Sequence, residues 1–328
     1  MKKDTILPKD TPIKTLNKIK KNPLEDIEYI KNIEKQLKKR RGYVFKMPKK
    51  KTPVILMFSG GLDSTTICDI LLRKYGLQVY PLHLRRGQIR MPIEEKAVAD
   101  LSKHFSKKFP KLFHQPQIVN AFIPPLEFRF DVTAHAEVKA NKKNNQWLGI
   151  PMYTSMAAEY AVNYAIHLEK SKGVKIRDIF FGIMSKDGLV MKYETLTFLR
   201  SATNHICQLM GDYSWQVSSL PVEKELGYYF DKEPLIQWCA KYKVPIHKSF
   251  SCLDPHYFHC GSCYYCQRRK NITKEIGEKD NTFYIDEQPF IRPIQIIDKV
   301  LYTLQYTKFF AQINKTFFKY FIKYFNGR

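Results

Sequence analysis

The 328-residue sequence lacks any apolar run long enough to cross a membrane. A membrane-spanning helix needs about 18 or more apolar residues in succession, and charged or polar side chains interrupt every such stretch here. The N-terminus, MKKDTILPKDTPIK, also lacks the apolar segment of a secretory signal peptide. We therefore expect a cytoplasmic protein whose seven cysteines are reduced and available to bind metal.

Acidic residues are scarce: 31 Asp and Glu stand against 55 Lys and Arg, which gives a formal net charge of +24 at pH 7. Such an excess favours anionic partners, namely nucleotides, nucleic acids or acidic protein surfaces. Lys, Asn, Ile, Tyr and Phe are all frequent, and an AT-rich genome produces this bias without any selection for binding. Nucleic-acid binding is therefore one interpretation of the charge, but not the favoured one.

Strand and helix patterns alternate through the middle of the chain. A continuous apolar run at 54–58 is typical of a strand buried on both faces, and a helix pattern with Ile67, Ile70 and Leu71 follows it. Further patterns predict strands at 79–84 and 179–183 and helices at 94–105, 156–168, 196–209 and 234–242. This order predicts an α/β fold built on a doubly wound parallel sheet.

No Walker motif is present, because the pattern G-x-x-x-x-G-K-S/T and its lysine are missing. A different glycine-rich turn, Phe58-Ser59-Gly60-Gly61-Leu62-Asp63-Ser64-Thr65, lies between the first strand and its helix. Glycines permit positive φ and a close approach to an anion, and the N–H groups at a helix start bind phosphate. Ser59, Ser64 and Thr65 add hydroxyl donors, while the Asp63 carboxylate suits a magnesium ion that bridges phosphates.

Four of the seven cysteines cluster in one short segment and predict a metal site formed by Cys252, Cys260, Cys263 and Cys266. Four thiolates are what a structural, tetrahedral zinc ion requires, and an iron–sulfur cluster is the main alternative. His256 and His259 are substitute ligands that four thiolates make unnecessary. The basic residues Arg268, Arg269 and Lys270 follow and are expected to offset the thiolate charge. The other cysteines, Cys68, Cys207 and Cys239, are expected in the core.

The S-G-G-x-D-S turn resembles the PP-loop ATP pyrophosphatases, which cleave ATP between its α and β phosphates and transfer AMP to an oxygen of the substrate. With the later S-C-x6-H-C-G-x-C-x-x-C-x-x-R pattern, residues 53–276 are most similar to the 7-cyano-7-deazaguanine synthase family. This resemblance implies a PP-loop fold and Ser59, Asp63 and Lys232 as catalytic residues. It also implies an ATP-binding set of Ser59, Gly60, Gly61, Leu62, Asp63, Ser64, Thr65, Gln88 and Asp187.

Two segments depart from the family pattern. The family's Pro-Gly-Arg-Asn is replaced by 150–155, Ile-Pro-Met-Tyr-Thr-Ser, and its Ser-Gly-Tyr-Pro-Asp-Cys-Arg substrate loop by 188–195, Gly-Leu-Val-Met-Lys-Tyr-Glu-Thr. The resemblance therefore extends to the ATP chemistry and leaves the acceptor open. Arg85, Arg86, Lys192 and Lys232 are candidates to balance anionic charge.

The expected function is ATP-dependent adenylation of a carboxylate, 7-carboxy-7-deazaguanine by resemblance, followed by attack of a nitrogen nucleophile. That nucleophile is ammonia, or, by analogy with synthase-like proteins of antiphage defence operons, an amine of a partner protein. ATP, Mg²⁺ and Zn²⁺ are the implied cofactors. The alternatives are a tRNA-modifying PP-loop enzyme, whose substrate would suit the positive charge, and a non-catalytic nucleotide-binding subunit.

The sequence divides into a basic N-terminal extension (1–51), a PP-loop core (52–248), a zinc segment (249–276) and a basic, aromatic C-terminal extension (277–328). We expect a helix at 23–40 that is an appendage with a solvated surface. In the C-terminal extension, one helical face carries Tyr306, Phe310, Ile313, Phe317, Phe321 and Tyr324. Such a basic amphipathic helix can sit on a membrane surface or on a partner protein. We expect this face to dock on the protein's own core, with a partner interface as the second interpretation. A homodimer is also possible.

Overall fold

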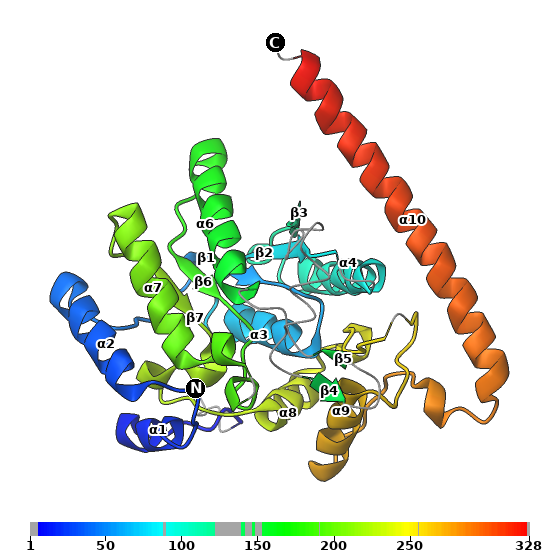
Figure 1. The fold of residues 1–328 in the computed structure, drawn as a ribbon, viewed down its shortest axis with the longest axis horizontal. Helices are drawn as coiled ribbons and strands as arrows, with labels where there is room; N and C mark the ends of the chain where they lie inside the picture. Colours follow the sequence, from blue (N-terminus) through cyan, green and yellow to red (C-terminus); the bar gives the residue numbers. More distant parts are fainter. Residues whose placement is uncertain are drawn as a thin grey trace.

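The structure is a computed structural model that describes residues 6–87, 90–121, 139–141, 146–147, 153–189, 191–254 and 256–326 (Figure 1). Its central sheet has five strands in the order β3-β2-β1-β6-β7. Their bounds are Pro53–Met57 for β1, Gln78–Arg85 for β2, Gln117–Asn120 for β3, Asp178–Phe180 for β6 and Gln216–Ser218 for β7. Two short strands, β4 (Lys139–Asn141) and β5 (Gln146–Trp147), form a separate antiparallel pair.

Every neighbouring pair in the central sheet is parallel, which confirms the predicted doubly wound sheet. From β1 the chain moves outward through β2 to β3, and it then returns to the other side of β1 to add β6 and β7. The direction of winding therefore reverses between β1 and β6. In open α/β sheets the crevice at such a reversal, beyond the carboxyl ends of the strands, is where ligands bind.

Two hydrophobic clusters cover the two faces of the sheet. Alternate residues of β1 point to opposite faces, so Val54 and Leu56 join one cluster while Ile55 and Met57 join the other. The first cluster packs α3 (Leu62–Arg73), α4 (Met91–Lys108) and α8 (Lys232–Tyr242), and the second packs α6 (Tyr153–Lys172) and α7 (Leu196–Met210). Cys68 and Cys239 lie in the first cluster and Cys207 in the second, as expected for core cysteines.

Each predicted helix and strand of the core is present with boundaries shifted by a few residues. The largest change is in α6, which spans Tyr153–Lys172 and not 156–168, while β6 ends at Phe180 and not at position 183. The strands β3 and β7 were not predicted, because each is short and carries a polar residue at both ends. Between the longer elements lie 3-10 turns: η2 (Asp187–Leu189), η3 (Lys192–Glu194), η4 (Leu220–Val222), η5 (Lys224–Leu226), η6 (Ile246–Lys248) and η7 (Ile285–Glu287).

The N-terminal extension packs on the core, so the expectation of a solvated appendage is wrong. It contains α1 (Pro12–Ile19), begun by the Thr11 cap, and α2 (Ile27–Arg41), which Figure 1 shows beside α7. The apolar side chains of α2 that recur on one face, Ile30, Ile33 and Leu37, are all buried. Basic composition concealed this face, because the lysines and arginines of α2 lie on its other sides.

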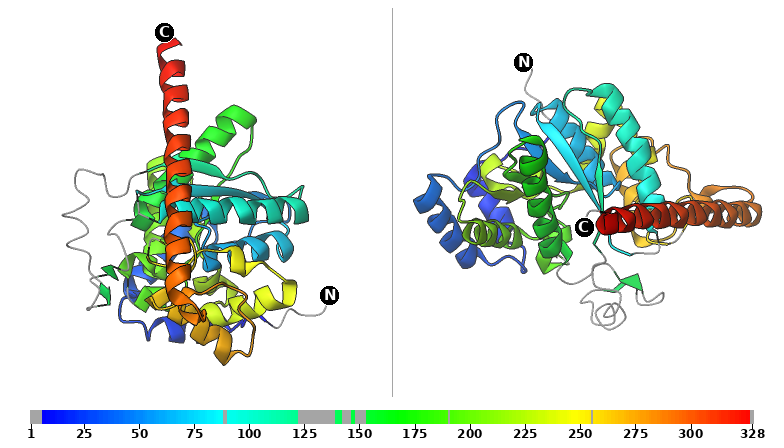
Figure 2. Two further views of the ribbon diagram at one scale, coloured as in Figure 1. Left: turned by 90° about the vertical axis from the view of Figure 1, so that its right-hand side faces the viewer. Right: turned by 90° about the horizontal axis from the view of Figure 1, so that it is seen from above.

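The C-terminal extension docks in part. Helix α9 (Tyr264–Glu275), in the cysteine segment before it, packs on α8, and the 36-residue α10 (Ile291–Asn326) contacts α4. Phe309 is buried, and Gln305 Nε2 donates to the Pro92 carbonyl at 3.5 Å. Beyond this contact α10 projects past the rest of the chain, as the left view in Figure 2 shows. Of the expected apolar stripe, Tyr306 is exposed, and the side chains of Phe310, Ile313, Phe317, Phe321 and Tyr324 lie outside the described part.

Among the described residues, no helix combines the length and the apolar character that crossing a bilayer requires, α10 included.

Candidate active site and metal centre

The glycine-rich turn lies at the carboxyl end of β1, where the winding of the sheet reverses. The Ser59 side-chain oxygen accepts a hydrogen bond from Gly61 N at 3.3 Å and lies 3.1 Å from the Ser64 hydroxyl, which holds the turn closed. Gly60 has φ of +77°, and a Cβ there would come within 3.0 Å of the Glu94 carbonyl oxygen and 3.1 Å of Val98 Cγ2. Conformation and space therefore both require glycine at this position.

A cleft lies above this turn and is lined by Ser59, Gly61, Leu62 and Asp63. Its opposite wall comes from the loop after β6, where Gly182 approaches so closely that a Cβ would lie 3.0 Å from Ser64 N. The cleft thus occupies the crevice between β1 and β6 that the topology predicts for a ligand.

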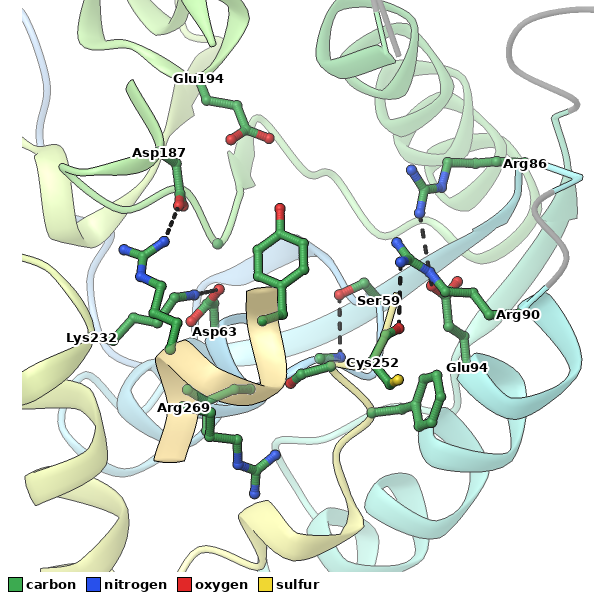
Figure 3. Close-up of a pocket in the computed structure, with 17 residues that line it drawn as sticks. Ser59, Asp63, Arg86, Arg90, Glu94, Asp187, Glu194, Lys232, Cys252 and Arg269 are labelled. Carbon is green, nitrogen blue, oxygen red and sulfur yellow. Dashed lines mark hydrogen bonds and ion pairs between the residues drawn. The ribbon is translucent and has the colours of Figure 1, made fainter. Parts of the chain in front are cut away.

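Acidic and basic side chains converge on one side of the cleft (Figure 3). Lys232, at the start of α8, forms an ion pair with Asp63 Oδ2. Asp187 Oδ1 lies 3.4 Å from Arg268, and Arg268 also makes a bidentate pair with Asp231 at 2.7 and 2.8 Å. The second oxygen of Asp63, Oδ1, is buried and has no hydrogen-bond partner in the described part of the chain.

Burial and mutual repulsion raise the pKa values of two acids of the cleft, Glu194 and Asp187. Burial, with the Asp187 carboxylate as the second cause, raises the pKa of Glu194 to about 8. Burial also raises the pKa of Asp187, and Asp63 adds to this effect while Lys232 and Arg268 oppose it. Carboxylates that repel one another in a buried site, one of them with an unsatisfied oxygen, favour a bound divalent cation. Asp63 and Asp187 therefore fit a Mg²⁺ site.

The other side of the cleft is formed by β2 and α4. Arg90 Nε donates to Glu94 Oε1 at 2.6 Å, and its NH1 donates to the Cys252 carbonyl at 3.4 Å. Arg86 lies 3.9 Å from the same Glu94 oxygen, and its guanidinium sits 4.4 Å from the centre of the Tyr153 ring. This wall presents two guanidinium groups to the cleft, and one carboxylate pairs with both.

A second cavity adjoins the cleft and shares Asp63, Arg86, Arg90 and Glu194 with it. Its walls carry aromatic and apolar side chains: Leu82, Leu84, Tyr153, Phe181, Met191 and Tyr193. Thr154 also lines it, and the Thr154 hydroxyl is buried with no hydrogen-bond partner among the described residues. A flat, partly polar ring would find aromatic surface here together with a carboxyl and a hydroxyl group.

The four clustered cysteines come together as predicted. Their sulfur atoms lie within 4.8 Å of one another and all four residues are buried. Cys252 and Cys263 sulfurs are 3.9 Å apart, and Cys263 N donates to the Cys260 sulfur at 3.3 Å. The group fits a metal-binding site with four thiolate ligands.

This metal segment forms part of the active-site wall. Phe250 N donates to the Gly60 carbonyl at 2.9 Å, and Cys252 lines the cleft. Helix α9 begins immediately after Cys263 and brings Tyr265 and Arg268 to the cleft. The ATP turn and the cysteine segment are therefore structurally continuous.

The three cations that follow the cysteines, which the sequence predicted as counter-charges of the thiolates, each pair with carboxylates. Arg268 pairs with Asp231 and Asp187, Arg269 with Asp280 at 3.0 Å, and Lys270 with Asp286 at 2.9 Å.

The two histidines of the segment make other bonds. His259 Nε2 accepts from Ser251 N at 3.1 Å, and burial lowers the pKa of its ring to about 3, so the ring is neutral. His256 Nδ1 lies 2.7 Å from Asp298. Neither ring belongs to the four-cysteine group.

Only some of the site residues predicted from the sequence line the cleft or the adjoining cavity. Ser59, Gly61, Leu62, Asp63, Ser64, Asp187 and Lys232 line the two cavities. Gly60 shapes the turn, and the Thr65 hydroxyl is turned inward to the Gly61 carbonyl at 2.7 Å. Gln88 lies outside the described residues. Arg86 lines the cleft, whereas Arg85 pairs with Glu95 and packs under Phe309, and Lys192 lies outside both cavities.

Arg90, Glu94, Glu194, Tyr265 and Arg268 were not predicted in the cleft. Glu194 lies in the segment that departs from the family pattern, so the pattern gave no signal for it. The others reach the cleft from helices α4 and α9, where they read as ordinary surface charges or aromatic residues.

Comparison with known proteins gives a consistent result. The family model of the queuosine biosynthesis protein QueC matches residues 53–277. A 7-cyano-7-deazaguanine synthase from Nautilia profundicola is 24% identical over 239 residues, covering 72% of this chain and 98% of the relative. The synthase from Methanococcus aeolicus is 24% identical over 250 residues, covering 70% and 98%.

Among solved structures, the U34-tRNA thiolase NcsA from Methanococcus maripaludis, with its 4Fe–4S cluster, is 12% identical with a TM-score of 0.33. That likeness covers 83% of this chain and 80% of the thiolase chain, and it is too weak to support an argument.

Proposed function

Because this chain belongs to the family of the queuosine biosynthesis protein QueC, we propose that it uses ATP to adenylate a carboxylate. The first candidate for that carboxylate is 7-carboxy-7-deazaguanine. The proposal is carried by one observation: the glycine-rich turn, the Asp63–Lys232 pair and the acids Asp187 and Glu194 all face a single cleft at the switch point of the sheet. ATP chemistry needs these parts together, and the fold brings them from three separate segments of the chain.

ATP binds with its phosphates at the turn. The Gly61 and Leu62 N–H groups at the start of α3 and the Ser59 hydroxyl donate to phosphate oxygens. Lys232, fixed by its pair with Asp63, neutralises negative charge beside them. Mg²⁺ held by Asp63 and Asp187 would supply charge compensation for the departing pyrophosphate. Arg86 and Arg90 provide further positive charge from the opposite wall.

The acceptor occupies the adjoining cavity. Its flat ring lies among Tyr153, Phe181 and Tyr193, and its polar edge reaches Glu194 and the Thr154 hydroxyl. One carboxylate oxygen of the acceptor attacks the α-phosphorus in line, the bond to the bridging oxygen breaks, and pyrophosphate leaves with that electron pair. The product is an acyl adenylate, which a nitrogen nucleophile then attacks with release of AMP.

Ammonia is the first nucleophile to test, and it would give an amide with release of AMP. A second ATP would then adenylate the amide oxygen, and loss of that oxygen with AMP and of two protons from the nitrogen would give the nitrile. An amine of a partner protein is the second, as in the proposed role in a defence system, and in that case a stable amide would form. The two outcomes differ in the mass of the product: a small nitrile in solution or a protein that has gained the deazapurine acyl group.

The metal is proposed to be zinc in a structural role. Four thiolates bound at about 2.3 Å to one tetrahedral ion lie about 3.8 Å apart, and the Cys252–Cys263 separation of 3.9 Å agrees with this. A four-iron cluster places its own iron and sulfide atoms between the cysteines and holds them further apart. Elemental analysis should find about one zinc ion per chain; iron with inorganic sulfide would reverse the assignment.

The deciding experiment measures AMP and pyrophosphate release from ATP with and without 7-carboxy-7-deazaguanine, in the absence of ammonia. Acid-dependent release supports the proposal. Asp63→Asn should lower the rate by about 10²-fold or more, because the metal and Lys232 both lose their carboxylate. Asp100→Asn, which removes a carboxylate on the outer surface of α4, is the matched control and should turn over like the wild type.

A tRNA-modifying enzyme is the second candidate and rests on the net charge of +24. Thiolation needs a reactive cysteine at the site. The Cys207 thiol is buried and donates to the Trp215 carbonyl at 3.5 Å. Burial raises its pKa to about 11, which suits a core thiol. Release of AMP that depends on tRNA and not on the acid would favour this candidate. ATP binding without AMP would instead favour a non-catalytic nucleotide-binding subunit.

A further inference from the structure

The segment from Asp187 to Leu196 carries two acids of the cleft and contains little regular structure. Its regular structure is the two 3-10 turns η2 and η3, each three residues long. Both Asp187 and Glu194 line the cleft, and Figure 3 shows their carboxyl groups above the ATP turn. Short 3-10 turns have weaker hydrogen-bond geometry than α-helices, so their position depends on what surrounds them.

Asn22, between α1 and α2, holds the beginning of this segment. Its Nδ2 donates to the Gly188 carbonyl at 3.0 Å, and its Oδ1 accepts from Leu24 N at 2.9 Å. Asn22 is 2% exposed, so the bond to Gly188 is shielded from water. Contact is tight here, because a Cβ on Gly188 would lie 2.8 Å from the Glu194 carbonyl oxygen and 3.2 Å from Asn22 Nδ2.

Glu25 holds the other end. Its Oε1 accepts from Leu196 N at 2.8 Å, and its Oε2 accepts from Thr197 N at 2.8 Å and from the Thr197 hydroxyl at 2.6 Å. These are free N–H groups of the first turn of α7, so the carboxylate caps that helix from another part of the chain. Only Thr195 separates the capped residues from Glu194.

The two residues are themselves fixed in place. Ile19, Ile30 and Leu196 form a buried cluster that joins α1 and α2 to the start of α7. Asp26 caps α2 through Tyr29 N at 2.9 Å, and its own N–H donates to Thr197 Oγ1 at 2.9 Å. The buried cluster and the Asp26 cap therefore hold Asn22 and Glu25 in place.

We propose that Asn22 and Glu25 are positioning residues of the active site, and that the N-terminal extension holds Asp187 and Glu194 in register with the ATP turn. This inference rests on the proposed function, because the two acids act on ATP, metal and acceptor only if the cleft is the catalytic site. The extension precedes the segment that matches the family model, so it is an addition of this chain to the family core.

Hydrogen–deuterium exchange of the full chain tests the structural half without any substrate. In Glu25→Ala the amides of Leu196 and Thr197 should exchange about tenfold faster, as expected for one lost hydrogen bond to a charged group. Asn22→Ala should speed exchange around Met191 and Glu194. Tyr29→Phe is the matched control, because it removes only the 3.2 Å contact between the extension and Ser201, one turn beyond the segment.

Steady-state kinetics of AMP release test the catalytic half. In both alanine variants the KM for 7-carboxy-7-deazaguanine should rise about tenfold. The KM for ATP should stay within about twofold in Glu25→Ala, which frees the end of the segment at Glu194, and should rise in Asn22→Ala, which frees Asp187. A merely structural role would reduce the folded fraction, which lowers kcat and leaves both KM values unchanged. Glu25→Gln, which keeps one acceptor oxygen, should recover part of the loss.

The inference is overturned if both KM values stay at the wild-type level, or if Tyr29→Phe behaves like Asn22→Ala. A wild-type protein that releases no AMP with the acid would instead overturn the proposed function. The exchange rates of Leu196 and Thr197 would then still decide whether the extension fixes the segment.

Discussion

The N-terminal extension (1–51) and the C-terminal extension (277–328) both extend beyond the 53–277 match to the family, yet they pack differently. Helix α2 buries Ile30, Ile33 and Leu37 against the core. Helix α10 buries Phe309, while Ile296 remains 66% exposed. Charge composition does not explain the difference, because the extension that packs more fully is the more basic one: it has 17 Lys and Arg against 6 acids, compared with 8 against 5 in the C-terminal extension.

The surface of the chain that each helix meets explains the contrast. Each helix has apolar residues at helical spacing, as in Ile296, Val300 and Leu304 of α10. Only α2 meets a face that complements it: α7 offers Leu196 to the apolar stripe and Arg200 to Glu34. An amphipathic stripe therefore predicts that a helix will dock, and the opposite surface decides whether it docks within its own chain.

The ion pairs beneath α2 provide the sharpest test of this contrast. Arg200 is 1% exposed and pairs with Glu223 at 2.7 Å and with Glu34 at 3.1 Å. Arg200→Ala should lower the free energy of unfolding by about 3–5 kcal/mol, because it leaves buried carboxylates unpaired. Lys308→Ala, on the exposed side of α10, should stay within about 0.5 kcal/mol in the same denaturant titration. A loss below about 1 kcal/mol for Arg200→Ala would show that α2 is weakly docked.

Matched truncations of apolar side chains give the next largest difference. Ile30→Ala removes a fully buried side chain and should lower the free energy of unfolding by about 2–4 kcal/mol. Ile297→Ala removes a side chain that is 52% exposed and should change it by about 0.5 kcal/mol or less. Thermal and denaturant unfolding measure both. Equal losses would mean that α10 is also covered in solution.

A buried acid behind the N-terminal extension predicts a pH dependence of stability. Burial raises the pKa of Asp178 to about 6, while its partner Gln216 also bonds the backbone of Lys46. The folded chain binds this proton more tightly than the unfolded chain does. The resulting stability is present below about pH 4 and is lost as the pH rises through 6.

Asp178→Asn keeps the oxygen acceptor and removes the titration. Its free energy of unfolding should therefore be about 1–3 kcal/mol higher than that of the wild type at pH 8, and the difference should vanish towards pH 4. Denaturant titrations at several pH values measure this, and a constant difference between the two proteins would contradict it.

Removal of the projecting end should have the smallest effect. A chain truncated after Gln312 keeps Phe309 and its contact with Arg85. We expect its melting temperature within about 2 °C of the full chain and its rate of AMP release within about twofold. Loss of AMP release at normal stability would show that the end of α10 serves the active site.

The sequence predicted the parts of the site that lie close together along the chain. The glycine-rich turn and the four cysteines depend on local spacing, so residues such as Ser59, Asp63 and Cys263 could be assigned to their sites directly. The alternating pattern likewise predicted the doubly wound sheet, because buried parallel strands are continuous apolar runs.

The sequence did not predict what depends on contacts between distant segments. Glu194 meets Asp187 and Asp63 only through the fold, and Asn22 meets Gly188 across 166 residues. Arg269 appeared to be a counter-ion for thiolates, yet it is held by Asp280. A charge pattern shows that a residue needs a partner, and only the packing shows which one.

The hydrogen bond from Phe250 to the Gly60 carbonyl has a consequence during synthesis on the ribosome. The turn is made early and its cysteine-bearing neighbour late, so a growing chain lacks the second wall of the cleft until most of it has left the exit tunnel. The pocket is therefore complete only when the cysteine segment has packed on the turn.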